Sequence, residues 1–303
     1  MTKSFSYSLC VLALVMLLTS CSAKHKDIPT LEPSVATTTT ASSTETVPTE
    51  TAMQNPSLDF RLAEAEALHA KLQDRIINDA SLSQADMNDL AGQQYTLWDT
   101  LLNELWAELT HTLPQVQMQQ LLQEERAWIR WKEHSLALVS DYYGGGSLSI
   151  LATDLRAAKL TQDRVYELAE ILARGVYPIP QTESELYRQV FLPLAASQQL
   201  DYENLQLLLE FRGLTLTEDE GIIEIRVPQF PETSVFAILS NESGKITIPQ
   251  LGYSITSSTT QKCVRVDFFP TPPTFYIDAA IWDDGKEVSS LEELTDYLCS
   301  ISD

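Results

Sequence analysis

The sequence is poor in basic residues, and this shortage excludes several classes of partner. Lys and Arg number 20 against 42 Asp and Glu in 303 residues, which gives a formal net charge of −22. The excess is −8 over residues 58–175 and −13 over residues 180–303, so it is not confined to a tail. Such a surface repels nucleic acid and anionic lipid headgroups. A cationic protein or a metal ion suits it better, and a charge that only keeps the protein soluble is the simpler alternative.

Histidine is equally scarce, and the familiar catalytic motifs are missing. The four histidines stand apart in the sequence: His25, His69, His111 and His134. None has the H-E-x-x-H spacing of a zinc site. There is no G-x-S-x-G motif, and the run from Gly144 to Ser147 lacks the strand that such a nucleophile follows. Glu124 and Glu125 are adjacent, so on a helix they point about 100° apart and cannot both face one substrate atom. We therefore predict no enzyme, no metal site and no cofactor.

Cysteine occurs four times, at Cys10, Cys21, Cys263 and Cys299. Cys10 lies in the apolar run Leu9–Leu18, which follows Lys3 and is too short to span a bilayer, as in a signal peptide. The residues that end this run, Leu18-Thr19-Ser20-Cys21, resemble a bacterial lipobox, in which the thiol of Cys21 is acylated after cleavage. An ordinary signal peptide with a chance cysteine is the alternative. We expect a signal peptide over residues 1–20 and an extracytoplasmic protein anchored to the membrane by lipid on Cys21. That membrane would be the outer one if the host has one.

The remaining two cysteines, Cys263 and Cys299, would meet an oxidising environment, where a disulfide persists. Closing that ring would remove roughly 3–4 kcal/mol of unfolded-chain entropy. Two reduced thiols are the alternative.

Residues 21–57 are predicted to form a disordered tether. Thr37–Thr40 and the spaced prolines offer too little apolar surface to offset the entropy of the chain. A coil of this length has an end-to-end distance of roughly 30–35 Å.

From residue 58 to residue 175 the apolar residues recur at helical spacing, which predicts four helices with short connections. A first buried stripe contains Leu58, Leu62, Ala65, Leu68, Leu72 and Ile76. Ser83 and Asp86 have the spacing of a capping box before the second helix. Pro114 suits the first turn of the third helix, and this helix is expected to end at the glycines at 144–146. Ser147 is expected to cap the fourth helix. Short connections favour antiparallel neighbours, so the fold class of this part is an all-α antiparallel bundle.

Residues 180–303 change in character after Tyr177-Pro178-Ile179-Pro180, which we interpret as a domain boundary. Two short helices near 183–196 and 201–212 are predicted first. Five segments rich in β-branched and aromatic residues then predict strands, at 221–227, 234–239, 245–248, 263–269 and 274–281. A helix capped by Ser290 closes the chain. This predicts a small α+β domain with an antiparallel meander.

Several short motifs in the helical part, in one order, carry a family resemblance. They are Gln84-Ala85-Asp86-Met87-Asn88, Trp98-Asp99, Leu102-Asn103, Leu113-Pro114, Glu125-Arg126-Ala127-Trp128-Ile129, Lys132-Glu133, Gly145-Gly146-Ser147, Leu160-Thr161 and Arg164. Over roughly residues 82–172 the chain resembles the N-terminal domain of the LprI-like lysozyme-inhibitor family of bacterial envelope proteins. The family usually has cysteines near Leu90, Leu136 and Leu155-Arg156, which are absent here, so the core must hold this domain together, its tryptophans above all.

The resemblance implies a tethered protein that binds, and through that binding inhibits, lysozyme or another cationic cell-wall hydrolase. Binding between opposite charges is fast and sensitive to salt. We expect the contacts at exposed acidic residues and at the turn of Gly145, Gly146 and Ser147, with Glu124 and Arg126 as further candidates. A purely structural turn is the alternative for that motif. The competing hypothesis for the whole protein is an envelope scaffold without inhibitory activity.

Overall fold

The computed structural model describes residues 57–175, 180, 182–227, 229–242, 245–256, 261–269, 272–278 and 285–299. The predicted signal peptide, Cys21 and the tether lie outside these residues, apart from Ser57. In the described part, no helix is long and apolar enough to cross a membrane.

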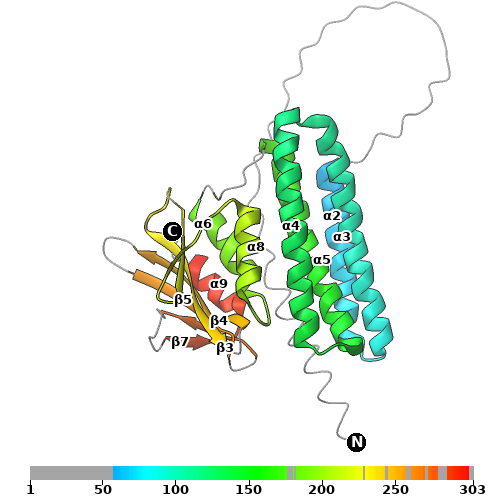
Figure 1. Ribbon diagram of the computed structural model, residues 1–303. Helices are drawn as coiled ribbons and strands as arrows, with labels where there is room; N and C mark the ends of the chain where they lie inside the picture. The colour runs from blue at the N-terminus through cyan, green and yellow to red at the C-terminus, as the bar shows by residue number, and fades with distance from the viewer. Residues whose placement is uncertain are drawn as a thin grey trace, which may run out of the picture.

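Four long helices form the first part of the molecule: α2 (Leu58–Asn78), α3 (Gln84–Thr112), α4 (Gln115–Tyr142) and α5 (Gly146–Arg174). They run up and down beside one another and are joined by short turns (Figure 1). The predicted capping box is confirmed, because Ser83 Oγ accepts from the amide of Asp86 while the Asp86 carboxylate accepts from the amide of Ser83. Pro114 is the N-cap of α4, one residue before the predicted position.

Two details of the helices differ from the prediction. Leu68 is 42% exposed, because His69 and not Leu68 turns toward the core, where its Nδ1 accepts a hydrogen bond from the indole of Trp98 at 3.1 Å. Ser147 does not cap α5: the N-cap is Gly145, the helix begins at Gly146, and no side chain caps it.

A bent helical segment follows, made of α6 (Glu183–Leu186), the π-helix η1 (Tyr187–Phe191) and α7 (Leu192–Ala195). Pro193 has no amide hydrogen, so the carbonyl of Gln189, four residues earlier, cannot receive an α-helical bond from it. The amide of Leu192 donates to the carbonyl of Tyr187, five residues back, which is the π-helical pattern. Helix α8 (Tyr202–Arg212) comes next, capped by Asp201 and ended by Gly213 in the left-handed region.

The rest of the chain forms a seven-stranded antiparallel sheet with its strands in sequence order, which confirms the meander. The strands are β1 (Thr217–Asp219), β2 (Ile222–Arg226), β3 (Thr233–Glu242), β4 (Lys245–Thr256), β5 (Gln261–Asp267), β6 (Thr274–Ile277) and β7 (Lys286–Val288). The polar edge strands β1 and β7 were not predicted, and neither was the second half of β4. Helix α9 (Leu291–Cys299) ends the described chain, with the Ser290 hydroxyl accepting from the amide of Glu293 as expected for a cap.

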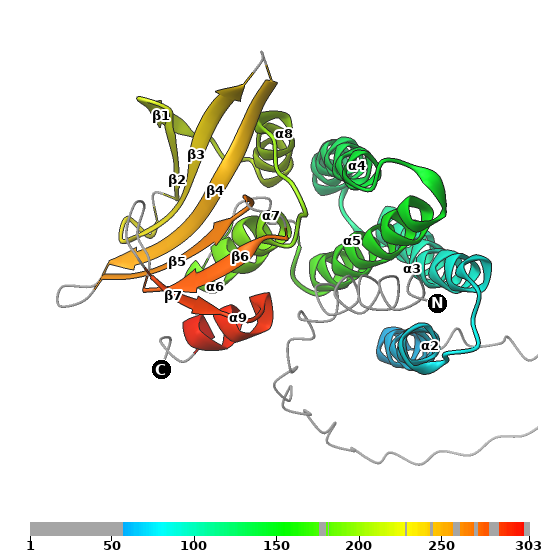
Figure 2. The same ribbon diagram turned by 90° about the horizontal axis from the view of Figure 1, so that it is seen from below.

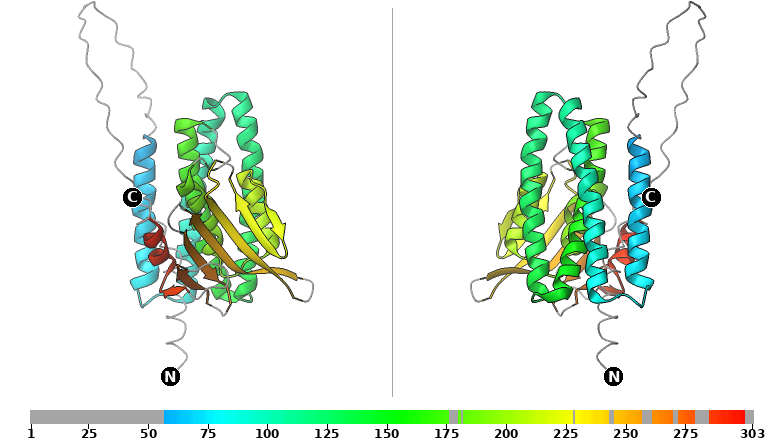
Figure 3. Two further views of the ribbon diagram at one scale, coloured as in Figure 1. Left: turned by 90° about the vertical axis from the view of Figure 1, so that its left-hand side faces the viewer. Right: turned by 90° about the vertical axis from the view of Figure 1, so that its right-hand side faces the viewer.

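The elements form layers (Figure 2). Helices α6, α7 and α8 cover one face of the sheet, α4 and α5 pack against these helices, and α2 and α3 lie beyond α4 and α5. Strands cross the direction of the long helices obliquely (Figure 3). One cluster of buried apolar residues runs through the bundle, the short helices and the sheet. The fold is thus an all-α bundle followed by a small α+β part; where the domain boundary falls stays a prediction, because residues 176–179 and 181 lie outside the described residues.

Candidate functional site

The predicted binding turn lies at one end of the bundle, which we call the turn end: residues 79–89 and 141–150. The connection from α2 to α3 and the connection from α4 to α5 meet there. A small separate core holds the two connections together. Its buried members are Leu72, Ile76, Leu90, Ala91, Val139, Leu151, Ala152 and Leu155. Leu82 and Met87 from one connection and Tyr143 and Leu148 from the other pack against it.

The turn end is acidic. Its two segments contain the aspartates Asp79, Asp86, Asp89 and Asp141 and no Lys, Arg or His. Hydrogen bonds from Ser81 lower the pKa of Asp79, and hydrogen bonds from Ser83 lower that of Asp86. These carboxylates are solvent-facing and stay ionised well into the acid range, so the turn end attracts cationic partners over a wide pH range.

Three exposed glycines shape the turn between α4 and α5. Gly144, Gly145 and Gly146 have φ of 66°, 79° and 82°, in the left-handed region that favours glycine. A Cβ at any of them would meet nothing within 4 Å. Their conformation, and not close packing, therefore requires glycine there. Ser147 is exposed beside them.

Glu124, proposed as a surface contact, is instead buried. It is 8% exposed, and its Oε1 accepts from Arg164 Nη1 at 2.8 Å. Glu125 Oε2 accepts from Nε of the same guanidinium at 2.9 Å, and Glu167 Oε2 accepts from Nη1 at 2.9 Å. The two adjacent glutamates thus converge on one guanidinium, each accepting from a different nitrogen of it. Their partner lies on α5, 39 and 40 residues away, which the local pattern did not reveal.

Arg126 is exposed, as the helical spacing from Trp128 predicts. It stands 19 residues before Gly145 in the chain, and at 1.5 Å per helical residue this places it on the order of 25 Å from the turn end. The structure therefore brings Gly145, Gly146 and Ser147 together with the four aspartates, but it does not bring Arg126 or Glu124 to them.

The remaining predicted site residues lie partly outside the described chain. Cys21 is among these, so its acylation stays a prediction. Cys263 is buried on β5, whereas the side chain of Cys299 is outside the described residues, so the disulfide between them stays a prediction as well.

The histidines of the described residues have structural partners or lie alone on the surface. His69 pairs with Trp98, and burial together with Lys159 lowers its pKa. His134 Nε2 lies 2.9 Å from Asp201 Oδ1, and His111 is exposed near the end of α3. Within the described residues no group of three or more His, Cys, Asp and Glu side chains is placed to hold a metal ion.

Comparison with protein families gives one match, and it covers the helical part from the end of α2 to the last third of α5. Residues 77–168 match the family model described as lysozyme inhibitor LprI. The helical part contains an LprI-like domain. This confirms the resemblance drawn from the sequence. No curated protein and no solved structure matches the chain.

Both connections of the turn end lie inside the matched region. Several residues that carried the resemblance are core residues of the LprI-like domain: Trp98, Trp128 and Arg164 are all at most 3% exposed. They belong to the buried core of the domain, whereas the turn from Gly145 to Ser147 is exposed, as are Asp86 and Arg126 of the same motif set.

Proposed function

We propose that this protein binds and inhibits lysozyme or another cationic cell-wall hydrolase through the turn end of its LprI-like domain. The observation that carries the proposal is the match of residues 77–168 to a lysozyme-inhibitor family. An inhibitor of this kind needs no catalytic residue of its own, and the protein is accordingly proposed to be a binding protein and not an enzyme.

Charge supports the choice of partner. The protein has a formal net charge of −22, and the turn end adds a local excess of four aspartates without a basic residue. Opposite fields speed the encounter of two proteins and make it sensitive to ionic strength. A basic hydrolase is the partner that such a surface attracts.

Shape supports the choice of surface. The turn end is one end of a long bundle, and its glycines carry no side chains that would keep a partner away from the backbone. Helix α5 begins there without a side-chain cap, so the amides of its first turn face solvent with their partial positive charge. The aspartates could pair with basic side chains of the hydrolase, and these amides could meet one of its carboxylates.

Anchoring completes the proposal. Acylation of Cys21 after removal of residues 1–20 would hold the protein on the outer side of the cytoplasmic membrane, or on the outer membrane if the host has one. The tether of residues 21–57 would let the bundle search the neighbouring cell wall, where hydrolases act.

A lysis assay tests the function. The soluble chain from residue 22 to residue 303 is mixed at micromolar concentration with lysozyme, and the clearing of a cell suspension is followed at low and at high salt. We expect protection at low salt that weakens as salt rises. Full lysis at low salt with micromolar protein would overturn the inhibitor function.

Paired variants test the surface. Asp89→Asn with Asp141→Asn removes two exposed charges of the turn end, and we expect a loss of protection of tenfold or more in the concentration required. Glu218→Gln with Asp219→Asn on the exposed edge strand β1 removes the same number of charges and serves as the control. Equal losses in both double variants would mean that net charge matters and the turn end does not.

The scaffold hypothesis is the alternative outcome of these tests. If the protein leaves hydrolases active but captures other envelope proteins through residues 180–303, the acidic bundle is not an inhibitor and the chain is a tethered interaction protein.

A further inference from the structure

We propose that the face formed by α4 and α5 is a binding surface whose partner is carried in the same chain, namely helices α6–α8 of the C-terminal part. On this inference the C-terminal part is a permanently bound component of the LprI-like domain, and the two stay together without the covalent link at residues 176–179. The proposal does not depend on the proposed inhibition.

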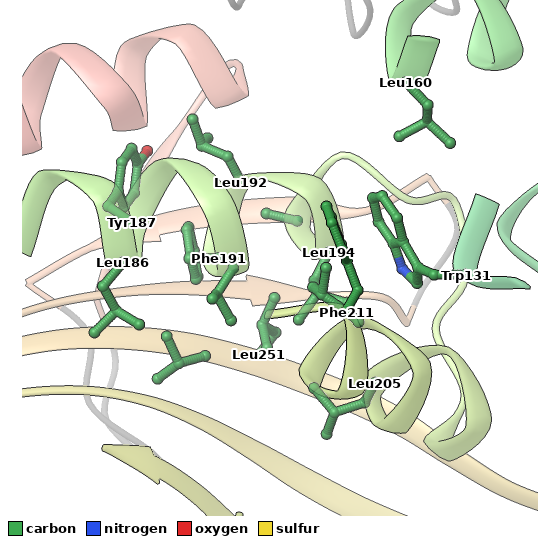
Figure 4. Close-up of a cluster of buried hydrophobic side chains, with 14 of the residues drawn as sticks. Trp131, Leu160, Leu186, Tyr187, Phe191, Leu192, Leu194, Leu205, Phe211 and Leu251 are labelled. Carbon is green, nitrogen blue, oxygen red and sulfur yellow. The ribbon is translucent and has the colours of Figure 1, made fainter. Parts of the chain in front are cut away.

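The first support is an apolar contact whose side chains are as buried as those of a protein core. Trp131 of α4 is 2% exposed and stacks on Phe211 of α8, with ring centroids 6.0 Å apart and planes 20° apart. Figure 4 shows these two rings side by side, with Leu194 of α7 and Leu205 of α8 close to Phe211. Leu194, Leu205 and Phe211 are each at most 2% exposed. Interfaces of separable partners have this kind of aromatic centre, and it usually carries most of the binding energy.

The second support is a chain of hydrogen bonds between α4 and the start of α8. Asn204 links the two helices twice, because its Oδ1 accepts from Trp131 Nε1 at 3.3 Å and its Nδ2 donates to Ser135 Oγ at 2.8 Å. One turn further along α4, His134 pairs with Asp201, and the carbonyl of Leu138 accepts from Gln199 Nε2 at 2.8 Å. The polar side chains of Trp131, Ser135 and Asn204 are thus matched across the contact, as in a specific interface.

The third support is a guanidinium that joins three elements. The carbonyl of Gln189, left without an α-helical donor by Pro193, accepts from Arg212 Nε at 3.1 Å. Arg212 Nη2 donates to Glu167 Oε1 on α5 at 2.6 Å. Pro193 of α7 thus leaves the carbonyl of Gln189 as an acceptor for Arg212, and this bond orients Arg212 toward the bundle. Arg156 of α5 completes the contact by donating to the carbonyl of Pro193 at 2.8 Å.

Charge complementarity explains why the bundle needs this partner. Glu124, Glu125 and Glu167 surround Arg164, so the bundle alone would place three carboxylates against one guanidinium in a buried position. Arg212 brings a second guanidinium, and its side chain is only 8% exposed. Burial would raise the pKa of Glu167, but Arg212 and Arg164 outweigh it and lower that pKa. The carboxylates of α4 and α5 are therefore paired with cations of the chain itself, one of which comes from the C-terminal part.

Cleavage of the folded protein tests the proposal. A specific protease site is inserted between Gly175 and Pro180 of the full soluble chain, the protein is cut, and the two pieces are followed by size-exclusion chromatography over a dilution series. We expect them to elute together at micromolar and at submicromolar concentration. Separation of the cut wild-type pieces at micromolar concentration would overturn the proposal.

Three variants of the cuttable chain refine the test. Arg212→Ala removes one of the two guanidinium partners of Glu167, which keeps only its bond to Arg164, and we expect the cut pieces to associate on the order of 100-fold more weakly. Arg226→Ala is the control, because Arg226 pairs with Glu224 within β2 on the exposed side and should change nothing. If Arg212→Ala does not fold before cleavage, Arg212→Lys keeps the charge and should give an intermediate weakening. Equal association in the Arg212 variants and in Arg226→Ala would contradict the role of Arg212.

Discussion

The indole of Trp131 on α4 lies almost parallel to the ring of Phe211 on α8, 80 residues later in the chain. The pair joins the bundle to the C-terminal part, so truncating either ring opens a cavity in a core that both parts share. Trp131→Ala should lower the free energy of unfolding by roughly 3–5 kcal/mol. Circular dichroism at a helix wavelength and near-ultraviolet absorption of the sheet tyrosines, followed in the same melt, should report one transition. Two separate transitions in the parent protein would show that the two parts fold independently.

Trp128 and Arg126 offer a matched pair on α4. Trp128 is 3% exposed, whereas Arg126 lies two positions away on the solvent side. Trp128→Ala should therefore cost roughly 3–5 kcal/mol, which is a large share of the roughly 5–15 kcal/mol that stabilises a whole domain. Arg126→Ala should change stability by less than about 0.5 kcal/mol. Urea unfolding of both variants measures the difference, and equal midpoints would show that the helix register is wrong.

Arg164 should be the most sensitive charged residue of the bundle. It is fully buried between Glu124, Glu125 and Glu167, and these carboxylates raise the pKa of its guanidinium against the effect of burial. Arg164→Ala leaves buried carboxylates unpaired and should cost roughly 3–5 kcal/mol. Arg174→Ala is the comparison, since Arg174 is 68% exposed and pairs with Glu170 on the surface, where such a pair contributes up to about 1 kcal/mol. Similar denaturation midpoints for the two variants would mean that the buried cluster is not a stabilising element.

Two glutamates beside Arg164 should respond to pH in opposite ways. Burial raises the pKa of Glu125 and outweighs the opposing effect of Arg164. Its contribution to stability is therefore fully present in acid and is lost as pH rises through the raised pKa. Glu167 has a lowered pKa, so its contribution is present above the ordinary Glu pKa and is lost as pH falls through the lowered one.

Glutamine variants separate these two effects. Glu125→Gln should lose less stability than the parent as pH rises from the ordinary Glu pKa through the raised one, because it has no proton to give up. Glu167→Gln should be less stable than the parent at neutral pH, with a deficit that shrinks in acid. Chemical denaturation from below the ordinary Glu pKa up to neutral pH gives both curves, and parallel curves for the two variants would contradict the assigned directions.

Gly252 on β4 should not tolerate a methyl group. A Cβ there would lie 1.8 Å from Cζ of Phe236 on the neighbouring strand, so the ring would have to move. Gly252→Ala should cost about 1–3 kcal/mol by overpacking. Gly92→Ala in α3 is the control: the nearest atom to its Cβ would be Asp154 Oδ2 at 3.8 Å, and alanine favours a helix over glycine by about 1 kcal/mol. Thermal melts should therefore shift in opposite directions.

Cys21→Ala should release the protein from the membrane. Without a thiol to acylate, the chain would stay unprocessed or leave the membrane fraction, while its fold is unchanged. Labelling with palmitate and fractionation of cells that express the parent and the variant measure this. Equal labelling and equal membrane association would show that Cys21 is not the lipid site.

The features that the sequence predicts correctly depend on residues close together in the chain. The capping box of Ser83 with Asp86 and the cap at Ser290 each involve residues three apart. Helical spacing placed Ala65, Leu72 and Ile76 of the first stripe correctly in the core. The meander followed from the alternation of apolar strands and polar turns, because an antiparallel neighbour needs only a short connection.

The features that sequence reasoning missed depend on distant partners. His69 takes a core position ahead of Leu68 because the indole of Trp98, on another helix, needs an acceptor. The sequence alone predicts Glu124 at the surface, because its partner Arg164 lies 40 residues away in the chain. Lone charged residues at buried positions of helical stripes are the signal that could have pointed to this cluster, since a buried charge requires a partner of opposite sign.

The four-helix topology also determines where the chain enters the bundle relative to the turn end. The chain enters the bundle at Leu58, and α2 then runs 21 residues, about 30 Å, to the turn end. For a chain held by lipid at Cys21, the tether and the proposed binding surface are therefore at opposite ends of the bundle. A hydrolase bound at the turn end would lie about one helix length, roughly 30 Å, from the point where the tether joins the bundle. Changing the length of the tether would change the volume that the protein searches without changing the binding surface.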